Sequence, residues 1–214
     1  MKKLLFAAVA VFTLANVNAQ DMNFGAKAGL NVTTLTGDVE DANSLIGAHV
    51  GVFAEFKISD KFSFQPELLF SMQGAKEKYS GTETFGGNTY SYTEEAKLKL
   101  SYINIPLMAK YYVAEKFSLE AGPQIGFLIS ANGDYEYSET LNGTTSSEST
   151  SEDVKDSFKG VDFGLNFGFG YDFTEKLSLG ARYNLGLGDI NDVDGSDAKI
   201  NNAGFQVSVG YKFN

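Results

Sequence analysis

Few residues in this chain have side chains suited to acid–base or nucleophilic chemistry. Its 214 residues include one histidine, His49, one arginine, Arg182, and no cysteine. A histidine acts as a catalytic base when a serine and an acid lie beside it. His49 lies in an alternating segment whose phase turns it towards the polar face, so we interpret it as a hydrogen-bonded structural residue. No catalytic residue and no enzymatic activity are predicted.

Arg182 is the strongest candidate for a functional side chain. It lies on the polar face of the segment 177–187, where one interpretation is a ligand-binding or gating residue. We favour a structural role, because a guanidinium binds a carboxylate through two parallel hydrogen bonds and buried charges must be paired. The predicted site is a lumen ion-pair network made of Arg182, the carboxylates Glu67, Glu120 and Asp162, and the lysines Lys27 and Lys110.

Acidic residues gather in two polar stretches of the chain. The stretch 188–201 contains an Asp-rich run, but its spacing lacks the bidentate glutamate of a calcium loop, so no metal or other cofactor is predicted. The stretch 131–158 carries seven acids and one lysine. Both stretches fit a solvated surface repelled by anionic lipopolysaccharide, and both also fit a surface that binds a protein or another ligand.

The elements that position these residues are expected to be strands. Apolar and polar residues alternate in eight segments, which is typical of half-buried strands. The expected strands are 24–31, 45–58, 62–72, 96–113, 117–129, 161–173, 177–187 and 205–213. The apolar residues of 96–113 change parity midway, which predicts a β-bulge near Ser101–Tyr102.

A phrase of a small residue, an acid and a lysine recurs at 58–64, 113–119 and 173–179. Strands joined so closely must form antiparallel hairpins. The other connections, 32–44, 73–95, 131–158 and 188–201, are expected to be long loops. Short and long connections therefore lie at opposite ends, and both termini lie at the short-turn end. The predicted fold is all-β: an eight-stranded antiparallel up-and-down transmembrane β-barrel.

The alternation does not by itself say which face points outward, and a soluble lipocalin-type barrel with an apolar interior is the alternative. Glycines and charges of both signs share the less apolar face, which suits a narrow interior where charges must pair. Phe56, Tyr111, Tyr171 and Tyr211 stand on the apolar face near the short turns, as in an aromatic girdle. We therefore expect the apolar face to contact lipid. Eight strands enclose a lumen that side chains fill.

The N-terminal residues are typical of an export signal. Lys2 and Lys3 precede an apolar run too short to span a bilayer, and small residues stand at 17 and 19. We predict that residues 1–19 form a cleaved signal peptide and that residues 20–214 form the barrel domain. The net charge of −10 argues against a nucleic-acid partner. The three prolines, Pro66, Pro106 and Pro123, fall inside expected strands, which bulges at those points would accommodate.

Three stretches resemble a known family. Gln65–Ser71, Tyr102–Tyr111 and Gly122–Gly126 are similar to the small outer-membrane β-barrel domain of PorT-like proteins, and the Ile105-Pro106-Leu107 stretch is the most specific part. The resemblance covers residue 24 to the end and implies an eight-stranded barrel in a Gram-negative outer membrane. It brings no shared catalytic residues, and some members of the family belong to secretion machinery.

The sequence therefore predicts an integral outer-membrane barrel with a side-chain-filled lumen and a structural or surface-interaction role. The expected partner is the lipid bilayer, with a protein or surface ligand at 131–158 and 188–201, and with the termini in the periplasm. A narrow small-solute channel and a subunit of a secretion or envelope complex are the alternatives. A lipid-acting enzyme would need a Ser/His/acid cluster, which the sequence does not offer.

Overall fold

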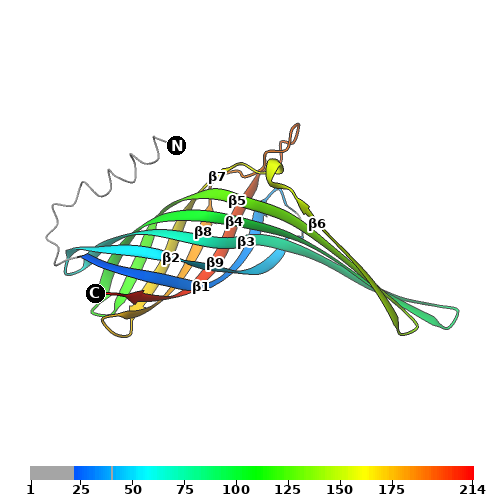
Figure 1. Cartoon of the computed structure of the whole chain (residues 1–214), viewed down its shortest axis with the longest axis horizontal. Coiled ribbons are helices and arrows are strands. Elements are labelled where there is room, and N and C mark those ends of the chain that lie inside the picture. Colours follow the sequence, from blue (N-terminus) through cyan, green and yellow to red (C-terminus); the bar gives the residue numbers. More distant parts are fainter. Residues whose placement is uncertain (1–21, 40) are drawn as a thin grey trace.

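Among the described residues, eight strands close into a ring, and a ninth strand lies outside it. The computed structural model describes residues 22–39 and 41–214. In chain order the strands are β1 (Met22–Gly37), β2 (Asn43–Ser59), β3 (Phe62–Phe85), β4 (Asn88–Ala114), β5 (Phe117–Leu141), β6 (Thr144–Asp153), β7 (Val161–Asp172), β8 (Leu177–Gly186) and β9 (Ile200–Lys212). The sheet order is β4-β3-β2-β1-β9-β8-β7-β5-β6, and β4 also pairs with β5 (Figure 1). The predicted eight-stranded antiparallel barrel is confirmed, with β6 as an additional strand that pairs with β5.

The ring turns its apolar residues outward and its polar residues inward. On β7, the rings of Phe163, Phe167 and Phe169 are about half exposed, at 53%, 49% and 48%, whereas Asp162 and Asn166 are buried. Tyr111, Tyr171 and Tyr211 also face outward near the short turns. This arrangement is the reverse of a soluble barrel and matches a lipid-facing wall. The expected orientation of the two faces is therefore confirmed.

β4 does not change phase, contrary to the sequence-based expectation. Leu100, Tyr102, Asn104, Met108 and Lys110 are all buried and lie on one face of the strand. The apolar pattern changes because the lumen itself changes from polar to apolar along β4. A register shift does occur at Ser101/Tyr102, but the unpaired residue is on the neighbouring strand: Ser101 pairs with Ser130 and Tyr102 with Leu128, which leaves Ile129 of β5 without a partner.

Three of the expected long loops are mostly strand. β1 continues to Gly37, and β3 and β4 pair continuously to a tight turn at Gly86–Gly87. The stretch 131–158, expected to be irregular, is mainly a hairpin: β5 continues to Leu141 and returns as β6, followed by the short 3-10 helix η2 (Lys155–Ser157). The polar composition of these segments suits strands with water on both faces as well as it suits loops. These segments therefore lack the alternation of apolar residues that would have identified them as strands.

The three prolines lie in strands, but the bulges expected beside them do not occur. Pro66 pairs with Leu107, and Pro106 with Gln124, and the register on either side of each pair is unchanged. Pro123 pairs with Leu165 in an uninterrupted register with β7. The register shifts of β2, β3, β4 and β5 lie elsewhere, so these prolines cost ladder hydrogen bonds without bending the strand pairing.

In the described part of the chain, no helix is long and apolar enough to cross a membrane. The predicted signal peptide, residues 1–19, lies outside the described residues. The short connections at 60–61, 115–116 and 173–176 gather at the end of the barrel where the C-terminus lies (Figure 1).

Candidate functional site

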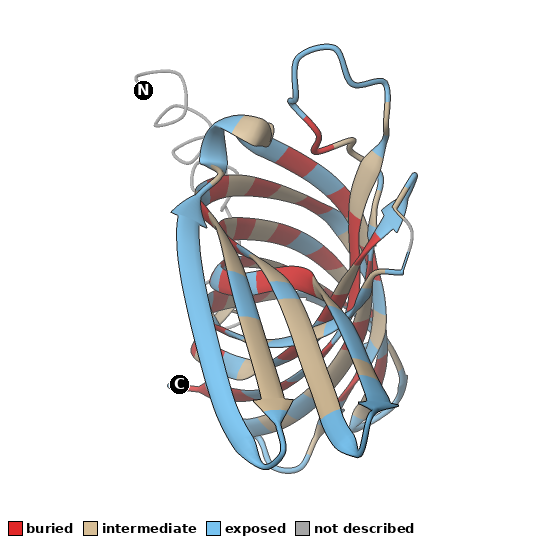
Figure 2. Cartoon of the chain, turned by 90° about the vertical axis from the view of Figure 1, so that its right-hand side faces the viewer, coloured by how far each residue is buried: buried red, intermediate tan, exposed pale blue. Residues whose placement is uncertain are grey.

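The lumen is filled by three layers of side chains. Lysines, glutamates and Arg182 occupy the part near the short turns, and buried amides such as Asn31, Asn166 and Asn184 occupy the middle. Leu100, Tyr102 and Ile190 belong to an apolar cluster at the opposite end. Figure 2 shows the buried residues alternating with exposed ones along the strands of the ring. The layers leave a packed interior, as expected for eight strands.

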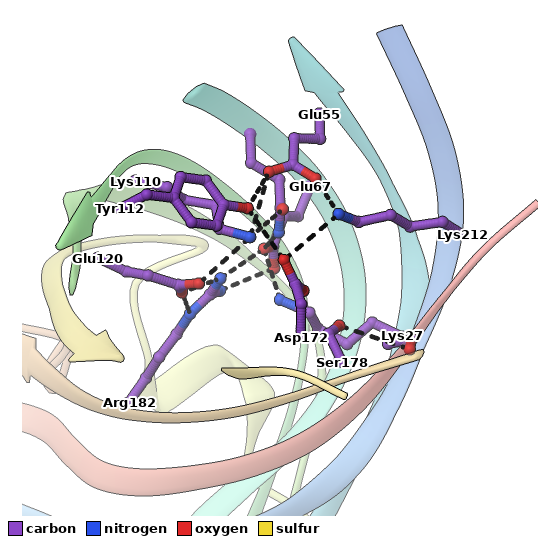
Figure 3. A network of polar contacts seen from close by, with 12 residues as sticks. Lys27, Glu55, Glu67, Lys110, Tyr112, Glu120, Asp172, Ser178, Arg182 and Lys212 are labelled. Atoms are coloured by element: carbon purple, nitrogen blue, oxygen red, sulfur yellow. Dashed lines mark hydrogen bonds and ion pairs between the residues drawn. The ribbon is translucent and has the colours of Figure 1, made fainter. Parts of the chain in front are cut away.

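Arg182 lies at the centre of the charged layer (Figure 3). Its Nη1 and Nη2 atoms donate to the two carboxylate oxygens of Glu67 over 2.9 and 2.7 Å. Its Nε donates to Oε2 of Glu120 over 2.8 Å. Lys27 Nζ also donates to Glu67, over 2.6 Å. These four residues were predicted to lie together, and the structure joins them through Arg182 and Glu67.

Lys110, which was predicted to belong to the network, connects it to residues that were not predicted. Lys110 Nζ lies 3.6 Å from Glu120 and 3.4 Å from Glu55. Lys212 Nζ lies 2.7 Å from Glu55 and 3.8 Å from Asp172. The hydroxyl of Tyr112 donates to Glu55 over 2.8 Å. Strand alternation puts Glu55, Asp172 and Lys212 on the polar face, but alternation alone gives no reason to place them in contact.

Each strand of the ring contributes one charged residue to this network. In strand order these are Lys27, Glu55, Glu67, Lys110, Glu120, Asp172, Arg182 and Lys212. Four are cations and four are carboxylates, so the network is neutral as a unit. Neutrality and mutual pairing are what a desolvated interior requires, since an unpaired buried charge is strongly destabilising.

Two glycines of β7 leave the room that this network occupies. Gly168 pairs with Arg182 across the β7–β8 ladder, and a Cβ atom on Gly168 would lie 2.7 Å from Arg182 Cγ. A Cβ atom on Gly170 would lie 2.7 Å from Oε1 of Glu120 and 2.9 Å from Oγ of Ser118. All three contacts are shorter than a Cβ atom tolerates. The glycine-rich polar face noted in the sequence therefore has a steric reason at these positions.

Asp162, predicted to join the network, lies elsewhere. Its Oδ2 atom accepts a hydrogen bond of 2.9 Å from Asn202 in the layer below the apolar cluster. It takes part in none of the ion pairs that the structure shows within the described residues, so its grouping with Arg182 was wrong. The parity of β7 identified its face correctly but not its height in the lumen. His49, as predicted, is a buried hydrogen-bonded residue, with Nδ1 2.7 Å from Oδ1 of Asn31.

The segment between β8 and β9 closes the apolar end of the lumen. Ile190 is fully buried in the apolar cluster with Leu100 and Tyr102. The adjacent Asp189 binds Lys159 Nζ over 2.6 Å and accepts backbone hydrogen bonds from Asn191 and Ile200. The Lys159 hydrogen bond, followed by the two backbone bonds, lowers the pKa of Asp189 to about 2. This segment therefore acts as a plug.

Across the described residues, no group of three or more His, Cys, Asp or Glu side chains is arranged to hold a metal ion.

A four-stranded sheet projects beyond the ring. We call this the projecting sheet; it consists of residues 75–85 of β3, 88–99 of β4, 132–141 of β5 and all of β6. Its two hairpins extend well past the other connections (Figure 1). Its inner face continues from the lumen, and its outer face continues from the lipid-facing wall.

A cavity lies at the root of the projecting sheet. Its volume is about 610 Å³, and it is bounded by the inner face and by the β1–β2 connection. Leu35, Val39, Leu98 and Val154 give it apolar walls. Tyr135, Glu77 and Glu152 are also among its lining residues. The cavity thus has both apolar and charged walls, and the lysines Lys76 and Lys97 line it beside the acids.

The amino-acid sequence matches a known family over most of its length. Residues 18–192 match the model of the family described as outer membrane protein beta-barrel domain. The chain belongs to this family. Together with the closed ring and its apolar outer wall, this membership makes the protein an integral outer-membrane β-barrel.

Several solved barrels resemble this outer-membrane barrel at low sequence identity. Ail, the attachment invasion locus protein of Yersinia pestis, is 11% identical with a TM-score of 0.44, over 90% of this chain and 99% of Ail. Neisserial surface protein A is 14% identical with a TM-score of 0.42, over 89% and 97%. CarO2 of Acinetobacter baumannii is 11% identical with a TM-score of 0.38, over 89% and 98%. Similarity at this level does not transfer a function. No curated protein sequence matches the chain.

Proposed function

We propose that this outer-membrane barrel is a non-catalytic anchor that presents the projecting sheet as an interaction surface outside the membrane. The observation that carries the proposal is the contrast between a lumen filled by mutually paired side chains and a four-stranded sheet with water-compatible residues on both faces. A solute pathway would have to break the network around Arg182, whereas the projecting sheet is open to contact.

The outer face of the projecting sheet supports its location outside the lipid. Within the ring this side of the strands carries residues such as Val50, Leu68 and Phe70. In the projecting sheet the same side carries lysines, serines and threonines, among them Lys97, Lys99 and Ser151. Charged side chains are destabilising on a lipid-facing wall. The change from apolar to charged and hydroxyl side chains therefore marks where the lipid-facing band ends, on the side of the projecting sheet.

The location of the two chain termini follows from the same proposal. We infer that export removes residues 1–19, that residues 20–214 form the mature domain, and that both termini lie in the periplasm with the short turns. The projecting sheet is then at the cell surface.

The absence of cysteine allows a direct test of this topology. Ser147→Cys in β6 and Glu115→Cys in a short turn each introduce a single thiol. A membrane-impermeant maleimide applied to intact cells is expected to label the Ser147→Cys protein and to leave the Glu115→Cys protein unlabelled until the outer membrane is opened. Labelling of Glu115→Cys but not Ser147→Cys in intact cells would overturn the proposed orientation.

The PorT-like resemblance favours a second candidate, a subunit of a secretion or envelope complex. The motif that supports it, Ile105-Pro106-Leu107, lies in the wall of the barrel rather than in the projecting sheet. Affinity purification of the tagged full chain from outer-membrane fractions tests it. A stoichiometric envelope partner supports the complex, and purification of the barrel alone contradicts it.

A further inference from the structure

The two faces of the projecting sheet differ in charge. On the outer face, four lysines face four acids: Lys76, Lys78, Lys97 and Lys99, with Glu95, Asp134, Glu136 and Asp153. Lys97 Nζ lies 2.9 Å from Glu136 and 3.7 Å from Glu95, and Lys99 pairs with Asp134. The outer face is therefore neutral, and three of its lysines are paired with three of its acids.

The inner face carries carboxylates without any lysine or arginine. The strand registers place six glutamates on it: Glu77, Glu83, Glu94, Glu139, Glu148 and Glu152. Strand alternation has thus separated six uncompensated negative charges from four compensated ones. A solvated surface needs no such separation, because both faces of the projecting sheet are in contact with water.

Tyrosines on the inner face form a platform between these glutamates. The hydroxyls of Tyr90 and Tyr137 lie 2.7 Å apart, and both donate to Oε2 of Glu139. The rings of Tyr90 and Tyr92 lie 6.1 Å apart. The ring of Tyr92 lies over Gly81, where a Cβ atom would come within 2.5 Å of it. Tyr90, Tyr92 and Tyr137 therefore lie side by side on the sheet, and each is partly exposed.

A surface of this composition is complementary to cations. Carboxylates pair with lysine and arginine, and aromatic faces attract the same groups. Lipid phosphates are negatively charged, as the glutamates are, and would be repelled. The six glutamates are spread over all four strands, with Glu148 and Glu152 four residues apart on β6 and Glu77 and Glu83 six apart on β3. At ~3.3 Å per residue these two pairs are about 13 and 20 Å apart, distances that a peptide spans only in an extended conformation. A small cation would engage one or two carboxylates, whereas an extended basic segment would engage several.

We propose that the inner face, together with the cavity at its root, binds a lysine- or arginine-rich polypeptide segment in an extended conformation. An apolar residue next to the basic run enters the cavity between Leu35, Leu98 and Val154. This inference rests on the proposed function, because the partner must reach the projecting sheet from outside the membrane.

The test uses the full-length protein in nanodiscs of uncharged phosphatidylcholine. Fluorescence anisotropy measures binding of a labelled twelve-residue peptide of alternating lysine and serine, with an alternating glutamate–serine peptide as the charge control. The lysine peptide is expected to bind, with an affinity that decreases as salt increases. The glutamate peptide is expected not to bind. No binding of the lysine peptide, or equal binding of both peptides, would overturn the proposal.

Two matched triple variants separate the inner face from general electrostatic attraction. The inner variant is Glu94→Gln, Glu139→Gln and Glu148→Gln; the outer variant is Glu95→Gln, Glu136→Gln and Asp153→Asn. Both change the net charge by +3. The inner variant is expected to weaken binding about tenfold and the outer variant less than twofold. Equal weakening by the two variants would show attraction by net charge alone and would overturn the proposal.

The cavity is tested with a second peptide that carries one phenylalanine at the end of the lysine–serine run. This peptide is expected to bind more tightly than the first, and Ala96→Trp, which places a ring in the cavity, is expected to abolish that gain. A gain that persists in Ala96→Trp would remove the cavity from the binding site. Maleimide labelling of Ser147→Cys in intact cells distinguishes the two proposals: labelling without peptide binding leaves the surface role and rejects this partner, whereas no labelling rejects the surface role itself.

Discussion

Glu67 and Arg182 join opposite sides of the barrel through two hydrogen bonds of 2.9 and 2.7 Å. Their strands, β3 and β8, are four positions apart in a ring of eight, so the pair spans the lumen. Because Arg182 also binds Glu120 of β5, one guanidinium connects three strands that are not neighbours. This contact supports the wall from inside and fills the path that a solute would take.

Removing the guanidinium is expected to destabilise the barrel strongly. Arg182→Met leaves Glu67 and Glu120 buried with fewer cations, and breaking a buried pair costs about 3–5 kcal/mol. The temperature at which the compact band disappears on a heat-modifiability gel should decrease markedly. Lys97→Met, which breaks an ion pair of the projecting sheet instead, is the control and should leave that temperature nearly unchanged. Equal temperatures for wild type and Arg182→Met would contradict the ion-pair role.

The two buried carboxylates Glu120 and Asp162 should respond differently to neutralisation. Glu120→Gln removes a charge that binds Arg182 and Lys110 and should lower stability. Asp162 accepts a hydrogen bond from Asn202 and forms no ion pair with the described residues, so Asp162→Asn removes a buried uncompensated charge. We expect Asp162→Asn to leave stability unchanged or higher. Denaturant unfolding in detergent measures both, and a greater loss for Asp162→Asn would contradict this assignment.

The space beside Gly170 should be required for the position of Glu120. In Gly170→Ala the new methyl group would meet the Glu120 carboxylate at 2.7 Å and displace it from Arg182. Gly180→Ala is the matched control, because its nearest contact would be an ordinary 3.5 Å to Ser208 Oγ. Gly170→Ala should lower the unfolding temperature and Gly180→Ala should not. Equal changes in unfolding temperature would show that the effect of replacing Gly170 comes from backbone entropy rather than from the contact with Glu120.

The plug segment should have a pH dependence set by Asp189. Its pKa is lowered from 3.8 to about 2 by the hydrogen bond from Lys159 and by backbone donors. A lowered pKa in the folded state means that the ionised carboxylate stabilises the segment above about pH 4. This contribution is lost as the pH falls towards 2. Titration of the Asp189 carboxyl carbon by NMR should give a pKa near 2 in the wild type and a higher value in Lys159→Met. The same pKa in both proteins would exclude the Lys159 contact as its cause.

Alternation within the ring strands was enough to predict the barrel. It identified the lipid-facing residues of β7 and the lumen position of Arg182, because one face meets lipid and the other meets polar side chains. The same signal cannot identify β6 or the ends of β3 and β4. Their two faces both meet water, so serine, threonine and glutamate occupy both faces and no alternation of apolar with polar residues appears.

The sequence predicts which side chains face the lumen, but it does not predict their positions along the barrel axis. Strand parity places Glu67, Asp162 and Arg182 on the inner side, yet the barrel stagger decides which of them meet. That stagger depends on pairing registers that the sequence alone does not specify. For the same reason, the apolar layer made by Leu100 and Tyr102 was interpreted as a bulge in β4 rather than as a change inside the lumen.

Conductance in a planar lipid bilayer tests the central claim of a closed anchor most directly. The purified full-length barrel, inserted from detergent, is expected to give no discrete conductance steps, since the network around Arg182 and the plug at Ile190 fill the lumen. Arg182→Met, if it still inserts, provides the comparison for a weakened lumen. Reproducible conductance steps from the wild-type protein would contradict the account and would favour a narrow channel.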